Sequence, residues 1–180
     1  MVNRYATIRF ETTPLKIGKW IVLRLPENAS AKLPSRGMAL VEGTVNGFHS
    51  KIVLEPDGEG SHWFKVSPDL RKAADIDVNH KVKIAVEPSQ AWPEPEVPTE
   101  LSKALKSDSQ AYALWMEITP MARWDWLRWI RSTNNAETRS RRIEVTLSKL
   151  KDGKRRPCCF NRNQCTEPEF SKNGVFSEAS

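Results

Sequence analysis

VEGTVNGFHSKIVLEPDGEGSHWFKVSPDLRKAADIDVNHKVKIAVEP, residues 41–88, is the stretch that decides the fold. Within it, Asn46-Gly47 separates two strand-like runs, Leu40 to Val45 and Phe48 to Leu54. Asn-Gly favours the type I′ turn, which needs positive φ at both central positions, so this pattern predicts a β-hairpin. Further along, His62 to Val66 predicts another strand, and Lys81 to Glu87 alternates strictly between apolar and polar residues, as a half-buried strand does.

Two more strands are predicted before this stretch, at Tyr5 to Thr12 and Trp20 to Leu25, which are rich in aromatic and β-branched residues. The turn-rich segment from Glu27 to Gly37 is expected to be an exposed loop. Ser67 before Pro68 is a typical helix start and predicts a short helix to Ala74. Six short strands with tight turns predict a small β-barrel, because closure removes exposed strand edges.

A proline-rich segment, residues 91–98, marks a change of pattern and is interpreted as a stiff linker. The chain after it has helical periodicity, with capping signals at Thr99 and at Thr119-Pro120. Helices are therefore predicted at 100–106, 109–117, 120–131 and 136–151. The expected organisation is a β-barrel module at 1–90, the linker at 91–98, a helical region at 99–156 and a polar, mobile tail at 157–180. This is an α+β fold.

The net charge of +6 is concentrated near the C-terminus. Residues 1–96 contain 13 basic and 12 acidic side chains, whereas residues 139–156 contain eight basic and two acidic ones. The N-terminus lacks the apolar stretch of a secretory signal, and no run is apolar enough to span a bilayer. The three cysteines are few and odd in number, which agrees with a cytoplasmic protein.

Two sets of residues resemble known bacterial families. The first set resembles a β module of unknown function. It consists of Gly43-Thr44-Val45-Asn46-Gly47, Pro56-Asp57-Gly58, His62, Arg71-Lys72-Ala73 and Lys81-Val82. The second set resembles the YdeI/OmpD-associated family, which is often labelled bacteriocin-resistance. It consists of Trp129-Ile130, Glu137-Thr138-Arg139, Arg141-Arg142-Ile143 and Gly153-Lys154-Arg155. Together the two resemblances cover roughly residues 5–156.

The resemblance implies a double-split, AbrB-like β-barrel followed by the helical region, and a protein connected with stress protection. The sequence departs from the usual β module at Asp75, where glycine is common, and at Asn79-His80, where Gly-Asp is common. Asn79 is expected to keep the turn through positive φ, whereas Asp75 would be strained if its backbone needs positive φ.

Candidate site residues in the β module are its histidines and one arginine. His49 and His62 fall in or beside strands, and Arg71 lies in the short helix, so a pocket formed by these residues is one hypothesis. In the helical region Trp124 is a candidate, because it falls away from the apolar face of its helix and near Arg128. The histidines have no metal-binding spacing, and structural or surface roles are the alternative for each of them.

No metal or cofactor is expected. Cys158 and Cys159 are adjacent, and with Cys165 they provide only three of the four ligands that a structural zinc site needs. Asp57-Gly58-Glu59-Gly60 lacks the length of a calcium loop and is interpreted as a β-turn. No catalytic motif stands out, so the sequence favours a protein that is not an enzyme, while an enzyme using the histidines or Arg71 stays open.

The basic cluster is the main candidate for binding an anion or a partner. It consists of Arg139, Arg141, Arg142, Lys154, Arg155 and Arg156. Guanidinium and ammonium groups bind phosphate and carboxylate. The alternative is structural: Arg139 and Arg142 would fix their helix through buried acidic partners.

Two functional hypotheses follow. In the first, the chain is a non-enzymatic binding or stress-protection protein, with a groove between barrel and helices for a protein or small-molecule ligand. In the second, it binds nucleic acid or regulates transcription through the basic C-terminal helix. The almost neutral N-terminal half argues against the second hypothesis, since AbrB-type proteins read DNA with basic strands and loops. The sequence does not define an oligomeric state.

Overall fold

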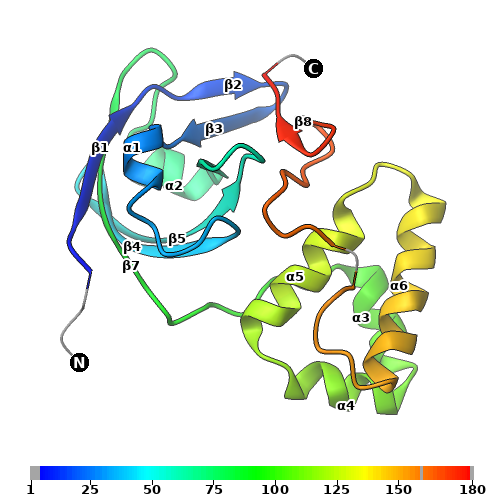
Figure 1. Ribbon diagram of the computed structural model, residues 1–180. Helices are drawn as coiled ribbons and strands as arrows, with labels where there is room; N and C mark the ends of the chain where they lie inside the picture. The colour runs from blue at the N-terminus through cyan, green and yellow to red at the C-terminus, as the bar shows by residue number, and fades with distance from the viewer. Residues whose placement is uncertain (1–4, 159, 179–180) are drawn as a thin grey trace. The chain divides into compact units, whose positions relative to one another are not determined.

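A computed structural model describes residues 5–158 and 160–178. The α+β class is confirmed: an antiparallel sheet comes first and the main helices follow (Figure 1). The chain forms two compact units, each with its own apolar core. The β unit consists of the residues up to 91 together with 162–165 and the residues from 170 onward, and the helical unit consists of 92–161 and 166–169.

All six predicted strands are present, and the described residues add three more. The strands are β1 (Ile8–Thr12), β2 (Leu15–Ile17), β3 (Trp20–Arg24), β4 (Ala39–Val45), β5 (Phe48–Pro56), β6 (His62–Lys65), β7 (Val82–Pro88), β8 (Ser171–Lys172) and β9 (Val175–Phe176). The helices are α1 (Glu27–Ser30), α2 (Pro68–Ala73), α3 (Thr99–Lys106), α4 (Ser109–Glu117), α5 (Pro120–Arg131) and α6 (Ala136–Lys151).

Seven strands form one sheet in the order β1-β7-β4-β5-β6-β3-β2, with every neighbouring pair antiparallel. The predicted hairpin joins β4 to β5, and Asn46 and Gly47 take φ values of 49° and 82° as its turn requires. The edge strands β1 and β2 are consecutive in the chain, and the Thr12 hydroxyl donates to the Arg24 carbonyl at 2.7 Å. The sheet is therefore curled and barrel-like (Figure 1).

The inner face of the curled sheet holds the main core of the β unit. Alternate residues of the strands point inward, among them Ile8, Leu23, Val41, Leu54, Phe64 and Val86. Gly43 lies on this face where β4 pairs with β7. A Cβ at Gly43 would lie 2.1 Å from the Ala85 carbonyl oxygen, so glycine is what lets the two strands approach so closely.

The outer face of β2, β3 and β6 carries a second apolar cluster, which we call the apolar face. Its members from the sheet are Ile17, Val22 and Trp63, with Trp20 packed at the border. Cys165, Phe170 and Phe176 from the C-terminal segment complete the same cluster. The polar tail was expected to be mobile, but the structure instead places three of its apolar side chains in a buried cluster and forms the β8–β9 hairpin from it. In Figure 1 this hairpin, in red, lies beside the ends of β2 and β3.

The segment from Glu27 to Gly37 is not the exposed loop that was predicted. It begins with α1, and its residues Ala29, Ser30 and Leu33 are buried. The Arg36 guanidinium ties the segment down by donating to the carbonyls of Ser30, Leu33 and Gly60. Small and apolar residues at helical spacing (Ala29, Leu33) were the overlooked signal.

The turns around β7 differ in part from expectation. Asp75 takes a φ of 50°, so the substitution of aspartate for the family's usual glycine does fall at a position with positive φ. Asn79 does not adopt positive φ, contrary to the prediction. Its backbone N–H instead bonds to the Asp77 carboxylate at 2.8 Å, which shapes the turn from the side chain.

The four helices of the helical unit lie where the sequence predicted them, within one residue. Asp108, Thr119 and Asn135 accept backbone N–H bonds at the starts of α4, α5 and α6, as N-caps do. The core contains Leu101, Leu105, Trp115, Trp126, Ile130 and Leu150. The residues from Trp92 onward are grouped with this unit, and Trp124 donates its indole N–H to the Pro93 carbonyl of the proline-rich segment.

Candidate functional site

The outer surface of β1, β7, β4 and β5 is polar and uncovered by other elements of the β unit, and we call it the polar face. Its side chains alternate with those of the inner core. Register places Arg9, Ala85, Thr44 and His49 in one row across the four strands. Glu87, Glu42 and Lys51 form the adjacent row.

This face is hollowed into a groove of about 1360 Å³. Ala85 and Thr44 form a low floor because their side chains are small, with the backbone of Gly43 beside them, and longer side chains rise around them. The lining residues are Tyr5, Thr7, Arg9, Glu42, Gly43, Thr44, His49, Ala85, Glu87, Pro88, Ser89, Gln90 and Ala91. Because all of them belong to the β unit, the groove is formed within a single unit.

Some of the charged groups of the groove have partners within it. The Thr7 hydroxyl donates to Glu87 at 2.9 Å, and His49 Nε2 lies 3.5 Å from Glu42 with both side chains largely in water. Arg9 is exposed and makes no hydrogen bond or ion pair with any residue that the structure describes. Exposed pairs of this kind contribute little to stability, so these charges remain able to exchange partners.

His62, the second candidate histidine, lies inside the β unit and is fully buried. Its Nε2 faces the Gly37 carbonyl oxygen at 2.9 Å, so Nε2 carries the hydrogen and Nδ1 accepts from the Ser30 hydroxyl at 3.2 Å. Burial away from water lowers the pKa of His62 below its ordinary value, and the nearby Arg36 acts in the same direction. His62 is therefore a neutral structural histidine, separate from the groove that His49 lines.

A buried polar network surrounds His62, and sequence reasoning did not find it. The Ser61 hydroxyl lies 2.9 Å from that of Ser30, and the buried Asp57 accepts from the backbone N–H groups of Glu59 and Ser61. Arg24 reaches Asp57 at 3.3 Å. These contacts explain Asp57-Gly58-Glu59-Gly60 as a bend between β5 and β6 that is pinned by its own aspartate.

Arg71 and Trp124 do not join His49 or His62 in a pocket that the described residues form. Arg71 is exposed on α2, in the β unit. Trp124, in the helical unit, donates its indole N–H to the Pro93 carbonyl at 2.9 Å. Arg128 lies over Phe160 at 5.3 Å rather than stacking on Trp124 as the sequence suggested.

Three charged side chains of α5 are buried, which the helical pattern did not predict: Arg123, Asp125 and Arg128. Arg123 donates to the carbonyls of Trp115, Met116 and Ile118 at the end of α4 and to the carboxylate of Glu94. It thereby satisfies the terminal carbonyls that a helix leaves open. Among described residues, no group of three or more His, Cys, Asp or Glu side chains is placed to hold a metal ion.

The first half of the basic cluster is engaged within the helical unit. Arg142 donates to the Trp129 carbonyl at 2.7 Å and to the Ser132 hydroxyl at 2.6 Å, and Arg139 reaches the Thr133 carbonyl at 3.3 Å. The two arginines thus fix α6 to the end of α5. The structural alternative named acidic partners on the barrel, but the partners are carbonyls and a hydroxyl of the helical unit itself.

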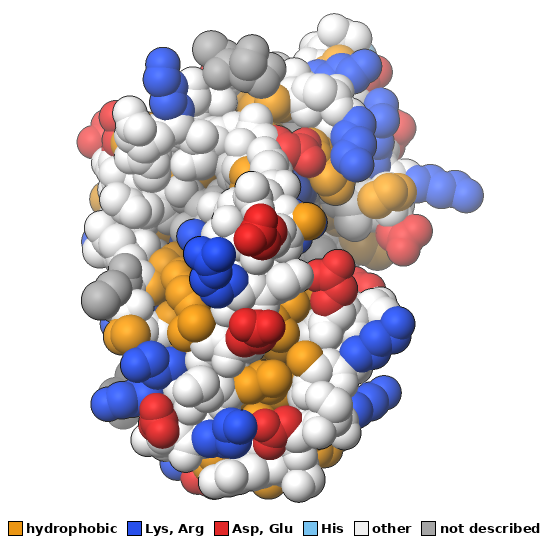
Figure 2. Space-filling model, turned by 90° about the vertical axis from the view of Figure 1, so that its right-hand side faces the viewer, with side chains coloured by type: hydrophobic (Ala, Val, Ile, Leu, Met, Phe, Trp, Pro, Cys, Tyr) orange, Lys and Arg blue, Asp and Glu red, His pale blue; other side chains and the backbone are white. Residues whose placement is uncertain are grey.

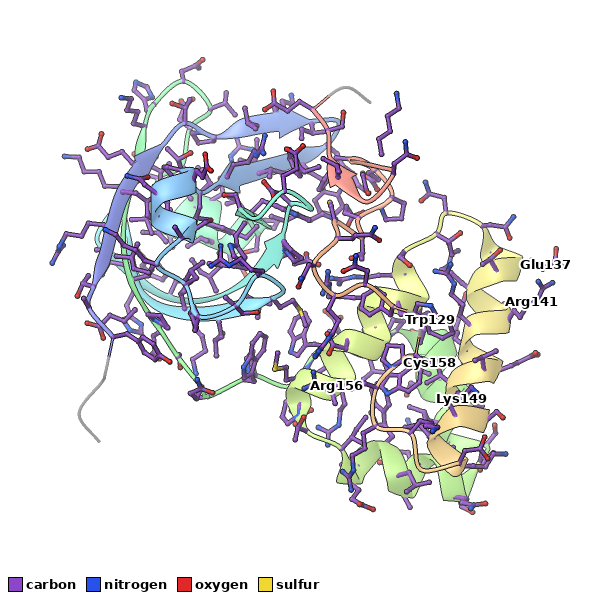
Figure 3. All side chains as sticks on the ribbon, in the orientation of Figure 1. Trp129, Glu137, Arg141, Lys149, Arg156 and Cys158 are labelled. Carbon is purple, nitrogen blue, oxygen red and sulfur yellow. The ribbon has the colours of Figure 1, made fainter. Side chains whose placement is uncertain are left out.

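The second half of the cluster is largely neutralised by carboxylates. Arg155 pairs with Glu117 at 2.6 Å and Arg156 with the buried Asp125 at 3.4 Å. Arg141 lies 3.7 Å from Glu137, and Figure 3 shows both projecting outward from α6. Lys154 is exposed. On the face that Figure 2 shows, Lys and Arg side chains are interspersed with Asp and Glu.

Its fold and surface define the chain as an α+β protein, in which a barrel-like β unit with an open polar face precedes a helical unit. Residues 6–86 match a domain of unknown function, DUF1905. Residues 94–153 match the OmdA family, described as bacteriocin-protection, YdeI or OmpD-associated. The chain therefore joins a DUF1905 module to a domain of the YdeI/OmpD-associated family, as the sequence resemblance indicated. A search of curated proteins found no match.

The two matches end before residue 154, so the C-terminal segment that completes the apolar face lies outside both. None of the helices in the described part of the chain has the length and apolar character that crossing a bilayer requires.

Proposed function

We propose that this chain is a non-enzymatic binding protein with a stress-protection role of the kind that the family description names. Its binding site is the polar face of the β unit. The observation that carries the proposal is the open groove of about 1360 Å³, over which four strands present charged side chains of both signs. Rigid strands position such groups more accurately than loops do.

The order of the charges defines the partner. From β1 to β5 the face presents Arg9, then the carboxylates of Glu87 and Glu42, then Lys51 and His49. Strands lie about 4.8 Å apart, so the strands that carry Arg9 and Lys51, at the two sides of the face, are about 14 Å apart. A complementary polypeptide therefore presents two cationic groups between two anionic ones.

Calorimetric titration with two capped tetrapeptides tests the proposal. Acetyl-Glu-Lys-Lys-Glu-amide matches the charge order, and acetyl-Lys-Glu-Glu-Lys-amide has the same composition in the opposite order. We expect the first to bind at least roughly tenfold more tightly, since like charges placed opposite one another are repelled. Arg9→Glu and the double substitution Glu42→Gln/Glu87→Gln should remove this preference.

Lys16→Ala is the matched control variant, because Lys16 is an exposed cation on β2, outside the groove. It should bind as the unsubstituted protein does. Equal affinities for the two tetrapeptides, or binding of neither, would overturn the polar face as the site.

We also propose the cytoplasm as the location of the protein. Cys158 and Cys165 are both free thiols, which is typical of a reducing compartment. Cys159 lies outside the described residues. Fractionation of cells that produce the tagged chain would test this, and recovery of the chain in the periplasmic fraction would contradict it.

A further inference from the structure

The C-terminal segment packs on the apolar face through two aromatic side chains. Trp63 contacts both of them, with its ring centre 5.0 Å from that of Phe170 in an edge-to-face arrangement and 5.6 Å from that of Phe176, and the two phenylalanine rings lie 5.5 Å apart. The indole N–H of Trp63 donates to the Pro56 carbonyl at 3.0 Å, which fixes its orientation from within the sheet. Aromatic pairs at these distances add to the free energy of apolar burial.

Cationic side chains of the sheet make cation–π contacts with the same two rings. The Arg24 guanidinium lies 4.6 Å from the ring centre of Phe176, and Lys65 Nζ lies 5.4 Å from that of Phe170. Arg24 also lies 3.5 Å from the carboxylate of Glu178, just after the hairpin. Cation–π contacts are directional, so they select aromatic rings over other apolar groups.

The backbone of the hairpin also contacts the bend at Asp57 and Gly58. The Phe176 N–H donates to the Asp57 carbonyl at 2.7 Å. Gly58 and Gly174 approach so closely that a Cβ on Gly58 would lie 2.1 Å from the Gly174 carbonyl oxygen. The hairpin supplies its own turn, with Asn173 and Gly174 at φ values of 54° and 79°.

The inner core of the sheet is built without the hairpin. The inner core of the β unit contains only residues between Ile8 and Val86, and none from the C-terminal segment. The receiving side chains, Ile17, Val22 and Trp63, also lie within the DUF1905 match, whereas the hairpin lies outside both family matches. The sheet therefore has an inner core to which the hairpin contributes no side chain.

We propose that the apolar face is a peptide-binding site and that the C-terminal hairpin is its ligand, held in place by its covalent link to the chain. The site takes a turn-forming peptide with two aromatic side chains six residues apart, as in Phe170 and Phe176. A tethered ligand has an effective concentration in the millimolar range, so a free peptide competes only when the hairpin is weakened. The hairpin thereby masks the site against peptides of the same pattern.

The test uses the full chain carrying Phe170→Ala/Phe176→Ala and a fluorescently labelled peptide of residues 162–178, under reducing conditions because of Cys165. Fluorescence anisotropy should show the peptide binding to the double variant at least roughly tenfold more tightly than to the unsubstituted chain, whose site is occupied. A peptide with the same two alanines should not bind. Circular dichroism should show that the double variant keeps its sheet.

Two results would overturn the proposal. If the folded double variant does not bind the peptide, the apolar face is not a peptide site. If the double variant loses its sheet, the hairpin is an integral part of the fold rather than a ligand.

A second protein separates these outcomes without changing the hairpin. A protease site inserted between Pro157 and Cys158 of the full chain allows the C-terminal segment to be cut free while it is still bound. We expect the fragment to stay bound at high concentration and to dissociate on dilution with the sheet intact. Unfolding on dissociation would contradict the proposal.

Discussion

The polar face and the apolar face are two parts of the outer surface of one curled sheet, and they differ in what their strands place outward. On β4 and β7 the outward residues are Glu42, Thr44, Ala85 and Glu87, and the groove over them is open. On β3 and β6 they include Val22 and Trp63, which are fully buried under the C-terminal hairpin. The comparison shows that one sheet can leave one outer surface uncovered by its own unit and cover the other with its own chain.

The largest expected effect comes from emptying the apolar face. Trp63→Ala removes an indole that is fully buried and contacts both Phe170 and Phe176, so it should lower the free energy of unfolding by about 3–5 kcal/mol. Thr44→Ala on the polar face is the control and should change it by less than about 0.5 kcal/mol. Urea unfolding of both variants measures this contrast, and equal effects would show that the two faces do not differ as described.

Gly43 tests the pairing beneath the polar face. Gly43→Ala places a methyl group 2.1 Å from the Ala85 carbonyl oxygen, which forces β4 and β7 apart and should cost about 1–3 kcal/mol. Ser50→Ala, directly opposite Gly43 on β5, serves as the control, since it changes the same region without the clash. Thermal unfolding of the two variants should separate them clearly; a Gly43→Ala protein as stable as the control would mean that the close approach is not required.

His62 should make the stability of the β unit depend on pH. The pKa of His62 is lowered in the folded state. As the pH falls below the ordinary value of 6.5, His62 therefore binds a proton in the unfolded chain before it does so in the folded chain. The free energy contributed by neutral His62 is therefore fully present above pH 6.5 and is lost as the pH falls through the folded-state pKa. Melting temperatures between pH 7.5 and 5 should decrease in this window.

His62→Gln is the comparison for that measurement, because glutamine does not titrate. The variant should be less stable at pH 7.5 but should lose the extra decrease at low pH. A decrease of the same size in both proteins would assign the pH dependence to other groups.

The smallest effect is expected for nucleic acid. Arg142, Arg155 and Arg156 already have partners within the helical unit, so few cations are left to displace the counterions of a duplex. A gel-shift titration of a random 20-base-pair DNA between 50 and 200 mM salt should show weak binding at most. Tight binding with a steep dependence on salt would instead support the hypothesis of a basic nucleic-acid surface.

Much of the fold could be predicted from local patterns. The Asn46-Gly47 turn, the alternation in β7 and the capping residue Thr119 placed strands and helices correctly, because each has a local physical cause. The cap predicted at Thr99 was wrong, because Thr99 is the first helical residue of α3 and Pro98 takes the N-cap position. Asn173-Gly174 is the same turn signal as Asn46-Gly47, and it was overlooked because the segment around it is polar. The continuous apolar run Trp20 to Leu23 was another sign, since a strand buried on both faces needs a cover on its outer side.

The candidate site was harder to predict. Arg9 and Glu87 meet on one face only through the pairing of β1 with β7, which are far apart in the chain, so spacing along the sequence could not bring them together. The buried partners of Arg123 and Arg142 are backbone carbonyls, which leave no trace in the residue types. Basic residues that stand close in sequence therefore indicated a binding surface, whereas the structure shows two of them, Arg139 and Arg142, bonded to carbonyls at the end of α5.

The central claim is that the polar face, and not the apolar face, is open to an outside partner. The most direct measurement is a ¹H–¹⁵N correlation spectrum of the full chain titrated with acetyl-Glu-Lys-Lys-Glu-amide. We predict that the signals of Arg9, Thr44 and Glu87 shift with increasing peptide, while those of Val22 and the Trp63 indole stay in place. Shifts confined to Val22 and Trp63, or no shifts at all, would contradict the account.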